Sequence, residues 1–291
     1  MTSVTAGIYA YYVLIAMFGL SVGSFLNVVI YRLPREGLRL ARPSRSFCPV
    51  CGATIRWFDN IPVLSWLVLK GRCRDCGQPI AVRYPLVELA GGLLALYLFW
   101  RFGPSVAFIL YYYFVICLLA IALIDLELMV IPDVLTYPAV AAGILCAVAD
   151  PSVSLTGIRL WAALEPSIGG SLTSLAGSLL GLGFGWASLK LVSIGYKLAR
   201  GHEGMGDGDP PLLGLIGSFL GWTAILPVIL CSTLIGLFCV GLMMLRSRGQ
   251  APPEGWAQKP LPFGPFLALA ALLYLFWGPG LLDWYWSLMS Y

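Results

Sequence analysis

The sequence predicts an all-α polytopic membrane protein, with about eight transmembrane helices and a small cytoplasmic zinc-ribbon-like domain after the first helix. Three observations lead to this fold class: an apolar composition, long apolar runs, and one polar stretch with paired cysteines. Of the 291 residues, 59% are hydrophobic and 11% charged, and the mean hydropathy is +0.86. A soluble domain carries roughly 25% charged residues. The polar side chains are therefore too few to cover a water-facing surface, and a lipid bilayer is the expected solvent.

The apolar runs give the expected helices. A spanning helix needs roughly 20 mainly apolar residues. The candidate runs are 7–31, 84–100, 104–125, 133–149, 167–199, 211–225, 227–245 and 264–288. The fifth run is too long for one simple span, and the sixth is short and rich in glycine, which suits close helix packing. We expect a first transmembrane helix at 1–31, a cytoplasmic tetracysteine zinc domain at 32–83, and a seven-helix membrane domain at 84–291.

The positions of Lys and Arg predict the orientation. Ten of the 18 lie between Arg32 and Arg83, and six more flank the end of the fifth run or precede the last one. Only Arg101 and Arg159 remain for the other side. Basic loops stay in the cytoplasm. We therefore expect the first loop in the cytoplasm and both termini in the periplasm of a bacterial inner membrane.

The polar loop contains two CxxC pairs. The segments CPVCG at 48–52 and CRDCG at 73–77 place Cys48, Cys51, Cys73 and Cys76 in two similar turns, with 21 residues between Cys51 and Cys73. Four thiolates suit the tetrahedral geometry of a structural Zn²⁺ site. The cytoplasm keeps thiols reduced, which argues against disulfides. With four protein ligands, the predicted metal has no open position for a substrate.

The loop also allows other interpretations. It could carry no metal, act as a redox dithiol, or bind nucleic acid through its arginines. The orientation rule already accounts for the basic charge, so we expect no nucleic-acid partner. The remaining cysteines, in apolar segments, are expected to pack as small hydrophobic side chains.

Two aspartates stand out because ionisable residues in or beside membrane helices usually mark function. Asp125 ends the apolar run from Tyr111 to Ile124, and Asp209 ends the sequence Gly206-Asp207-Gly208-Asp209 just before the sixth run. The predicted orientation puts both on the cytoplasmic side. Two close carboxyl groups do not ionise equally easily, so one can accept a proton while the other donates one. This is the acid–base pair needed for peptide hydrolysis without a covalent intermediate.

The residues alone do not show which of the neighbouring acidic residues form the catalytic pair. Glu127 and Asp133 lie near Asp125, and Asp207 lies near Asp209. The glycines of the second segment, Gly204, Gly206 and Gly208, are expected to let the backbone turn sharply and approach a substrate closely. His202 is the one histidine of the chain, and no HExxH zinc-protease motif is present.

Together these segments resemble the prepilin peptidases, which are membrane aspartic proteases of the GxGD type. The motifs that carry the resemblance are Gly23-Ser24-Phe25-Leu26-Asn27-Val28-Val29-Ile30-Tyr31-Arg32-Leu33-Pro34, the two CxxC pairs, Asn60-Ile61-Pro62-Val63-Leu64-Ser65-Trp66, Arg83-Tyr84-Pro85-Leu86-Val87-Glu88, Ile124-Asp125 with Ile131-Pro132-Asp133, and Glu203-Gly204-Met205-Gly206-Asp207-Gly208-Asp209. They follow one another in the family's order over nearly the whole chain. One departure is Pro210-Pro211, where members often have an apolar residue and Lys; proline fits the first turn of a helix.

The resemblance implies roles for these residues. Asp125 and Asp209 would be catalytic, with Gly206, Gly208 and Asp133 in support. The substrates would be type IV prepilins or type II secretion pseudopilins, which are cut on the cytoplasmic side after a short basic leader. Members with the tetracysteine loop often also methylate the new N-terminus with S-adenosylmethionine. Glu88 is a candidate contact of that methyl donor; the alternative is a helix-end residue paired with Arg83.

Two other classes of function fit parts of the sequence. A transporter or channel could use membrane aspartates as a proton relay, and a scaffold could bind a cytoplasmic partner through the zinc loop. A relay needs acids in mid-span, whereas Asp125 and Asp209 are expected at the cytoplasmic ends of helices. The sequence therefore favours the enzyme, and it does not predict an oligomeric state.

Overall fold

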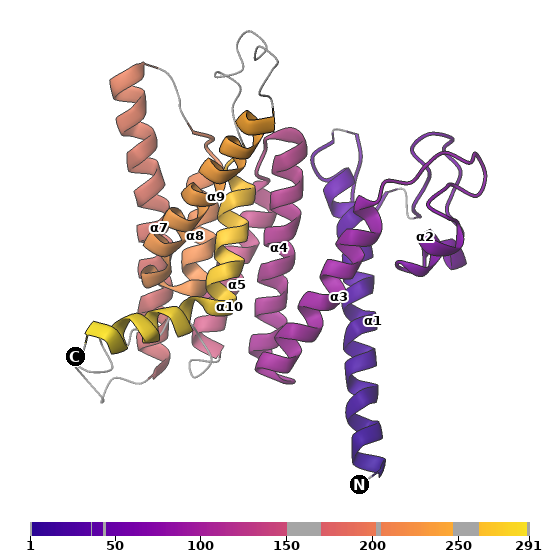
Figure 1. The fold of residues 1–291 in the computed structure, drawn as a ribbon, viewed down its shortest axis with the longest axis horizontal. Helices are drawn as coiled ribbons and strands as arrows, with labels where there is room; N and C mark the ends of the chain where they lie inside the picture. Colours follow the sequence, from indigo (N-terminus) through magenta and orange to yellow (C-terminus); the bar gives the residue numbers. More distant parts are fainter. Residues whose placement is uncertain are drawn as a thin grey trace. The chain divides into compact units, whose positions relative to one another are not determined.

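The computed structural model describes residues 2–35, 37–42, 45–149, 170–201, 205–246 and 262–289. In chain order the elements are α1 (Thr2–Arg32), η1 (Trp57–Asn60), α2 (Leu64–Val68), α3 (Arg83–Phe102), α4 (Val106–Leu128), α5 (Asp133–Ala149), α7 (Gly170–Arg200), α8 (Asp209–Leu220), η2 (Trp222–Ala224), α9 (Ile225–Arg246) and α10 (Gly264–Met289) (Figure 1). β pairing in these residues is limited to isolated bridges in the first loop. The all-α prediction is confirmed.

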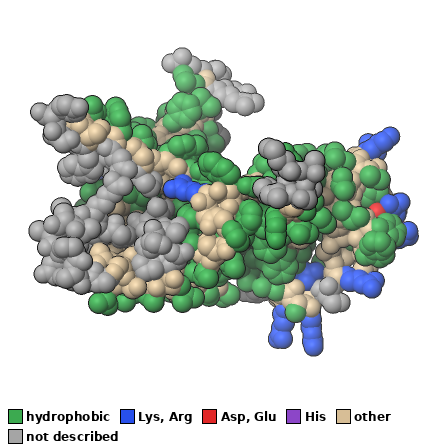
Figure 2. Space-filling model, turned by 90° about the horizontal axis from the view of Figure 1, so that it is seen from below, with side chains coloured by type: hydrophobic (Ala, Val, Ile, Leu, Met, Phe, Trp, Pro, Cys, Tyr) green, Lys and Arg blue, Asp and Glu red, His purple; other side chains and the backbone are tan. Residues whose placement is uncertain are grey.

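Five helical segments are long and apolar enough to cross a membrane among the described residues: Tyr9–Arg32, Arg83–Phe102, Val106–Leu128, Gly170–Arg200 and Trp222–Leu245. α5 and the first part of α10, Gly264–Gly278, are shorter apolar helices. In the view of Figure 2, hydrophobic side chains cover much of the surface that is drawn. The chain is therefore a membrane protein.

The predicted run 211–225 differs from the structure. The helix there, α8, has 12 residues and ends at Leu220, because Gly221 turns the backbone with a φ of 79°. This backbone conformation favours glycine. Pro210 and Pro211 lie in the first turn of α8, where proline is tolerated, as expected.

The chain forms two compact units, Met1–Ile116 and Cys117–Tyr291. The predicted division into a first helix, a zinc domain and a seven-helix domain remains a prediction.

In the first unit, α1 and α3 pack at glycines. A Cβ atom on Gly19 would lie 2.7 Å from the Gly91 carbonyl oxygen, and one on Gly23 would lie 2.7 Å from the Glu88 Cα. The buried Tyr112 hydroxyl donates to the carbonyl oxygens of Gly19 and Gly91, at 3.3 and 3.2 Å. Small residues permit this close backbone approach in a membrane, where helices gain little from hydrophobic association.

In the second unit, α8 is the central helix. Each of its residues except Pro211 is buried, as expected for a helix that is apolar on every face. α7 meets it at Gly181 and Gly217, where a Cβ on either glycine would overlap the other's carbonyl oxygen. The Ser178 hydroxyl also donates to the Ser218 carbonyl oxygen, at 2.7 Å. These contacts fix α8, and therefore the position of Asp209 at its first residue.

Gly217→Ala is expected to destabilise the second unit by about 1–3 kcal/mol, because the added methyl group forces α7 and α8 apart. Gly183→Ala is the matched control, since a Cβ at Gly183 in α7 meets no atom within 4 Å. That change should be neutral or stabilising by up to about 1 kcal/mol. Thermal unfolding of the two variants in one detergent measures the difference. Equal melting temperatures would contradict the proposed packing.

Candidate functional site

The Asp125 carboxyl group lies in the last turn of α4 and is 5% exposed. Its Oδ2 accepts a hydrogen bond from the backbone N–H of Gly264, the first residue of α10, at 3.1 Å. The first N–H groups of a helix have no partner within the helix. They also carry partial positive charge. The start of α10 therefore stabilises negative charge on Asp125.

The Asp209 carboxyl group lies at the first residue of α8 and is also 5% exposed. It interacts electrostatically with Asp125. No hydrogen bond joins the two carboxyl groups in the part of the chain that the structure describes. The two side chains thus share one buried site of the second unit, which brings together the end of α4 and the starts of α8 and α10.

Asp209 lies outside the five candidate spans. Burial and, to a smaller extent, the charge of Asp125 raise the pKa of Asp209 from its ordinary value of 3.8 to about 7, although the backbone N–H of Gly206 acts in the opposite direction. A carboxyl group in this condition holds its proton near neutral pH. Asp209 is therefore a carboxyl group that is partly protonated near neutral pH, in the same buried site as Asp125.

The glycines before Asp209 have a steric role. A Cβ on Gly208 would lie 2.6 Å from the Ile131 Cβ, and one on Gly264 would lie 2.7 Å from the Asp125 Oδ2. Gly208 has φ −81°, an ordinary helical value, and Gly206 is not at positive φ. The chain does turn here: Asp207 and Gly208 lie in a turn, and the Asp209 N–H donates to the Gly206 carbonyl oxygen at 3.3 Å. Close packing against Ile131 excludes a side chain from Gly208, and the close approach of these glycines to a substrate stays a prediction.

Burial distinguishes Asp125 and Asp209 from the neighbouring acidic residues that the sequence left as alternatives. Glu127, Asp133 and Asp207 are exposed, whereas Asp125 and Asp209 are buried. Asp207 forms an ion pair with Lys190 at 3.2 Å, and Asp133 is the first residue of α5. Asp133 is therefore placed to favour the start of that helix.

Sequence reasoning missed Gly264. This residue lies 139 positions from the carboxylate to which it donates, so no local pattern connects the two. The available signal was Gly264-Pro265 before an apolar run, which is typical of a helix start. His202, Glu203 and Gly204 lie outside the described residues.

The four cysteines of the first loop form one cluster, as predicted. The Sγ atoms of Cys48, Cys51, Cys73 and Cys76 all lie within 4.8 Å of one another, and those of Cys48 and Cys76 are 3.9 Å apart. Four sulfurs around a tetrahedral ion at about 2.3 Å would be separated by roughly 3.8 Å. The donor set and its spacing therefore fit a bound metal ion.

The two cysteine turns have the same geometry. Gly52 and Gly77 have φ values of 73° and 71°, and their N–H groups donate to the carbonyl oxygens of Cys48 and Cys73, at 2.9 and 3.0 Å. Hydrogen bonds from the backbone N–H groups of Cys51 and Val50 lower the pKa of the Cys48 thiol to about 7. The backbone thus favours a thiolate, the form that binds metals.

The pKa of Cys76 shifts in the opposite direction. The Gln78 backbone lowers it, but partial desolvation of this exposed residue and hydrogen bonds with the other three cysteines outweigh that effect and raise the pKa of Cys76 to about 12. Both shifts arise within one cluster of thiols. The first thiolate to form hinders the last, and a cation would relieve this repulsion.

Two further interactions hold the loop together. The Arg74 guanidinium binds both carboxylate oxygens of Asp59, at 2.6 and 2.7 Å, and lowers the pKa of Asp59. The Glu88 Oε2 accepts a hydrogen bond from the Val63 N–H at 2.7 Å. Val63 has φ 63° and ψ −49°, and Leu64 N–H donates to the Pro62 carbonyl. This is a strained γ-turn, which Glu88 stabilises from α3.

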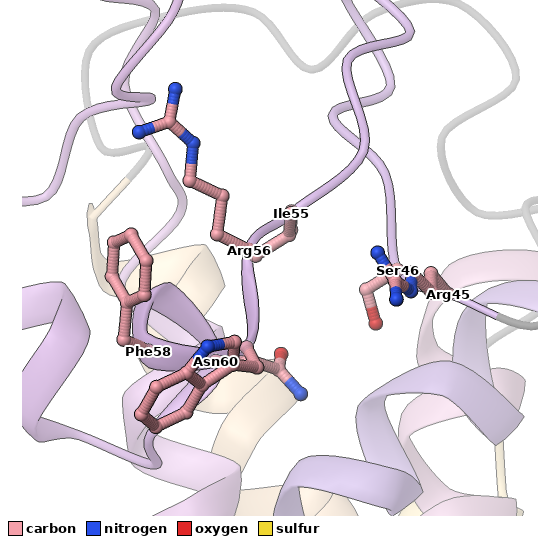
Figure 3. Close-up of a pocket in the computed structure, with 7 residues that line it drawn as sticks. Arg45, Ser46, Ile55, Arg56, Phe58 and Asn60 are labelled. Carbon is pink, nitrogen blue, oxygen red and sulfur yellow. The ribbon is translucent and has the colours of Figure 1, made fainter.

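An open cavity of about 390 Å³ lies in the same loop (Figure 3). Its lining combines two arginines with aromatic and polar side chains: Arg45, Ser46, Ile55, Arg56, Trp57, Phe58 and Asn60. The Arg56 guanidinium lies 6.0 Å from the centre of the Phe58 ring. The cavity is therefore amphipathic, and it does not include the cysteine cluster.

Comparisons with known proteins identify the family of the chain. Residues 17–102 match the bacterial peptidase A24 N-terminal domain, and residues 112–241 match the type IV leader peptidase family. The prepilin leader peptidase/N-methyltransferase of Aeromonas hydrophila is 37% identical over 94% of this chain and 93% of that protein. The proteins of the same name from Pseudomonas aeruginosa and Myxococcus xanthus are each 38% identical, over 90% and 94% of this chain and 89% and 74% of their own length. No solved structure matches the chain significantly.

The two matched regions cover both compact units, and the relatives align with the chain over most of its length. The chain therefore belongs to the type IV leader peptidase family.

Proposed function

We propose that this protein is a membrane aspartic endopeptidase that removes the short leader of type IV prepilins or type II secretion pseudopilins. The main observation that supports this proposal is that Asp125 and Asp209 are buried in one site, whereas the other nearby acidic residues are exposed. Family membership and the names of the relatives support the substrate class. In this proposal Asp125 and Asp209 are the catalytic residues, and Gly206, Gly208 and Asp133 support them.

The geometry suggests how the two carboxyl groups divide the work. Asp125, whose charge is stabilised by the Gly264 N–H, is the general base that takes a proton from water. The water oxygen then attacks the carbonyl carbon of the scissile peptide bond. Asp209, which holds its proton near pH 7, donates a hydrogen bond to the carbonyl oxygen. The proton taken from water finally passes to the leaving nitrogen, and the C–N bond breaks.

A second activity is also proposed. The relatives are named as N-methyltransferases as well as peptidases, which supports methylation of the new N-terminus with S-adenosylmethionine. Glu88 remains the candidate contact of the methyl donor. Its Oε2 is already bound to Val63, so a donor contact would use Oε1.

We infer that the ion in the cysteine cluster is Zn²⁺. Four cysteine ligands complete a tetrahedral shell and leave no position for substrate, so the ion would stabilise the loop rather than take part in cleavage. We place the protein in a bacterial inner membrane with both termini periplasmic and the loop and aspartates facing the cytoplasm. The concentration of Lys and Arg between Arg32 and Arg83 supports this orientation.

Asp125→Asn and Asp209→Asn are each expected to reduce cleavage by about 100-fold or more. An amide at 125 cannot take the proton from water, and an amide N–H at 209 is a much weaker acid than the carboxyl O–H and polarises the scissile carbonyl less. The measurement is cleavage of a tagged prepilin by purified protein in detergent. Asp207→Asn, which changes an exposed neighbouring acid, is the matched control and should retain most of the activity. Normal cleavage by either of the first two variants would refute the catalytic pair.

The pH dependence follows from the raised pKa of Asp209. Below about pH 7 this carboxyl group keeps its proton and can act as the acid; above it, both aspartates are ionised. The kcat/KM for cleavage is therefore expected to fall as the pH rises from 7 to 9. Asp207→Asn should show the same fall. A rate that stays constant to pH 9 would contradict the assignment of Asp209 as the acid.

Cys48→Ser is expected to lower the zinc content from about one ion per chain, because serine replaces one of four thiolate ligands. Cys239→Ser, which changes a cysteine of α9 outside the cluster, should leave the zinc content unchanged. Elemental analysis of both purified variants measures the effect. An absence of zinc from the wild-type protein would overturn the inferred metal.

A further inference from the structure

The short helix α2 has one exposed apolar face. Leu64, Leu67 and Val68 are 60%, 57% and 75% exposed. Their spacing of three and four residues places them on the same side of a helix. We call these three residues the apolar stripe. Three adjacent exposed aliphatic side chains form an apolar patch, the kind of surface that marks a candidate contact with protein or membrane.

The opposite face of α2 binds the loop domain. The Trp66 Nε1 donates to the Ile80 carbonyl oxygen at 3.1 Å, and the Ser65 hydroxyl donates to the Phe58 carbonyl oxygen at 3.0 Å. Gly71 lies against the Trp66 ring, since a Cβ there would meet the ring at 2.8 Å. The orientation of α2 is therefore set by its inner face, and the stripe is held outward.

The Glu88–Val63 hydrogen bond fixes the level of α2 relative to the membrane-spanning helices of its own unit. Glu88 lies in the second turn of α3, and its backbone packs directly against Gly23 of α1. Gly23 precedes Arg32, the end of the α1 span, by nine residues, or about 13 Å along the helix. α2 begins at Leu64, directly after Val63. It therefore starts beside the spans rather than beyond their ends.

Basic side chains flank this region. Lys70 follows α2 and Arg56 precedes η1, and both are exposed. In Figure 2, several Lys and Arg side chains lie toward the right, the side on which Figure 1 shows α2. An apolar helix face with exposed cations nearby in the chain is the pattern of a helix that lies in the interface of an anionic bilayer.

We propose that the apolar stripe inserts into the interface of an anionic phospholipid bilayer and so holds the cysteine-cluster loop at the membrane surface. Leu64, Leu67 and Val68 contact the acyl boundary, while Lys70 and Arg56 reach the phosphate groups. The proposal is independent of the peptidase and methyltransferase activities, because it rests on the position and polarity of α2.

The test measures the surroundings of the stripe in the full chain. A ketone-bearing residue replaces Leu67 or Val68 in separate variants and carries a nitroxide, which leaves all eight cysteines unmodified. Each variant is placed in nanodiscs that contain phosphatidylglycerol, and zinc content reports folding. Collision with O₂, which concentrates in lipid, is compared with collision with a water-soluble nickel chelate.

Two labelled positions calibrate the scale. Leu93, 65% exposed on α3, is the lipid standard, and Val50, 66% exposed in a cysteine turn, is the loop standard. Labels at Leu67 and Val68 should favour O₂, as at Leu93. Labels as accessible to nickel as the one at Val50 would overturn the proposal. Labels shielded from both reagents would also overturn it, since protein rather than lipid would then cover the stripe.

A second measurement uses no label. Leu67→Gln combined with Val68→Gln should accelerate tryptic cleavage after Lys70 in the nanodiscs by roughly tenfold or more, because weaker anchoring lets the loop open more often. Val50→Gln is the matched control and should leave the cleavage rate unchanged. An unchanged rate in the double variant would contradict membrane anchoring.

Discussion

The backbone contact between Gly181 and Gly217 determines much of the second unit. It lets α7 and α8 approach so closely that α8 is buried on nearly every face. A 12-residue helix in that position carries its first residue, Asp209, into a site with little water. Burial is the main reason for the raised pKa of Asp209. A packing constraint between two glycines therefore has a direct chemical consequence for a carboxyl group eight residues earlier in the chain.

Much of this site was accessible from sequence, and the limits are informative. The cysteine cluster was predictable because each turn is encoded by five consecutive residues, with glycine where the backbone needs positive φ. The two aspartates were found because carboxylates beside apolar runs are costly. The residues alone did not distinguish Asp209 from Asp207. The structure does so by burial, which depends on the packing of α5 and α7 around α8 and not on any local pattern.

Two contacts could not be predicted from the sequence, and the physical reason is the same for both. Gly264 reaches Asp125 through a backbone N–H, and Val63 reaches Glu88 through another. A backbone N–H carries no side-chain signature, so its partner is set by where the chain folds back. The predicted span 211–225 was too long for a related reason, since one positive φ at Gly221 ends the helix within an uninterrupted apolar run.

The position of the acids also bears on the rival interpretation as a proton relay. A relay across a membrane needs titratable groups distributed through the span. Here Asp125 occupies the last turn of α4, and Asp209 the first residue of α8. The N–H of a third helix start stabilises charge on Asp125. Helix termini have unpaired N–H groups and lie where an extended peptide can enter. Backbone groups in the middle of a span are already paired within the helix. This arrangement suits a reaction on a polypeptide that enters from the membrane surface.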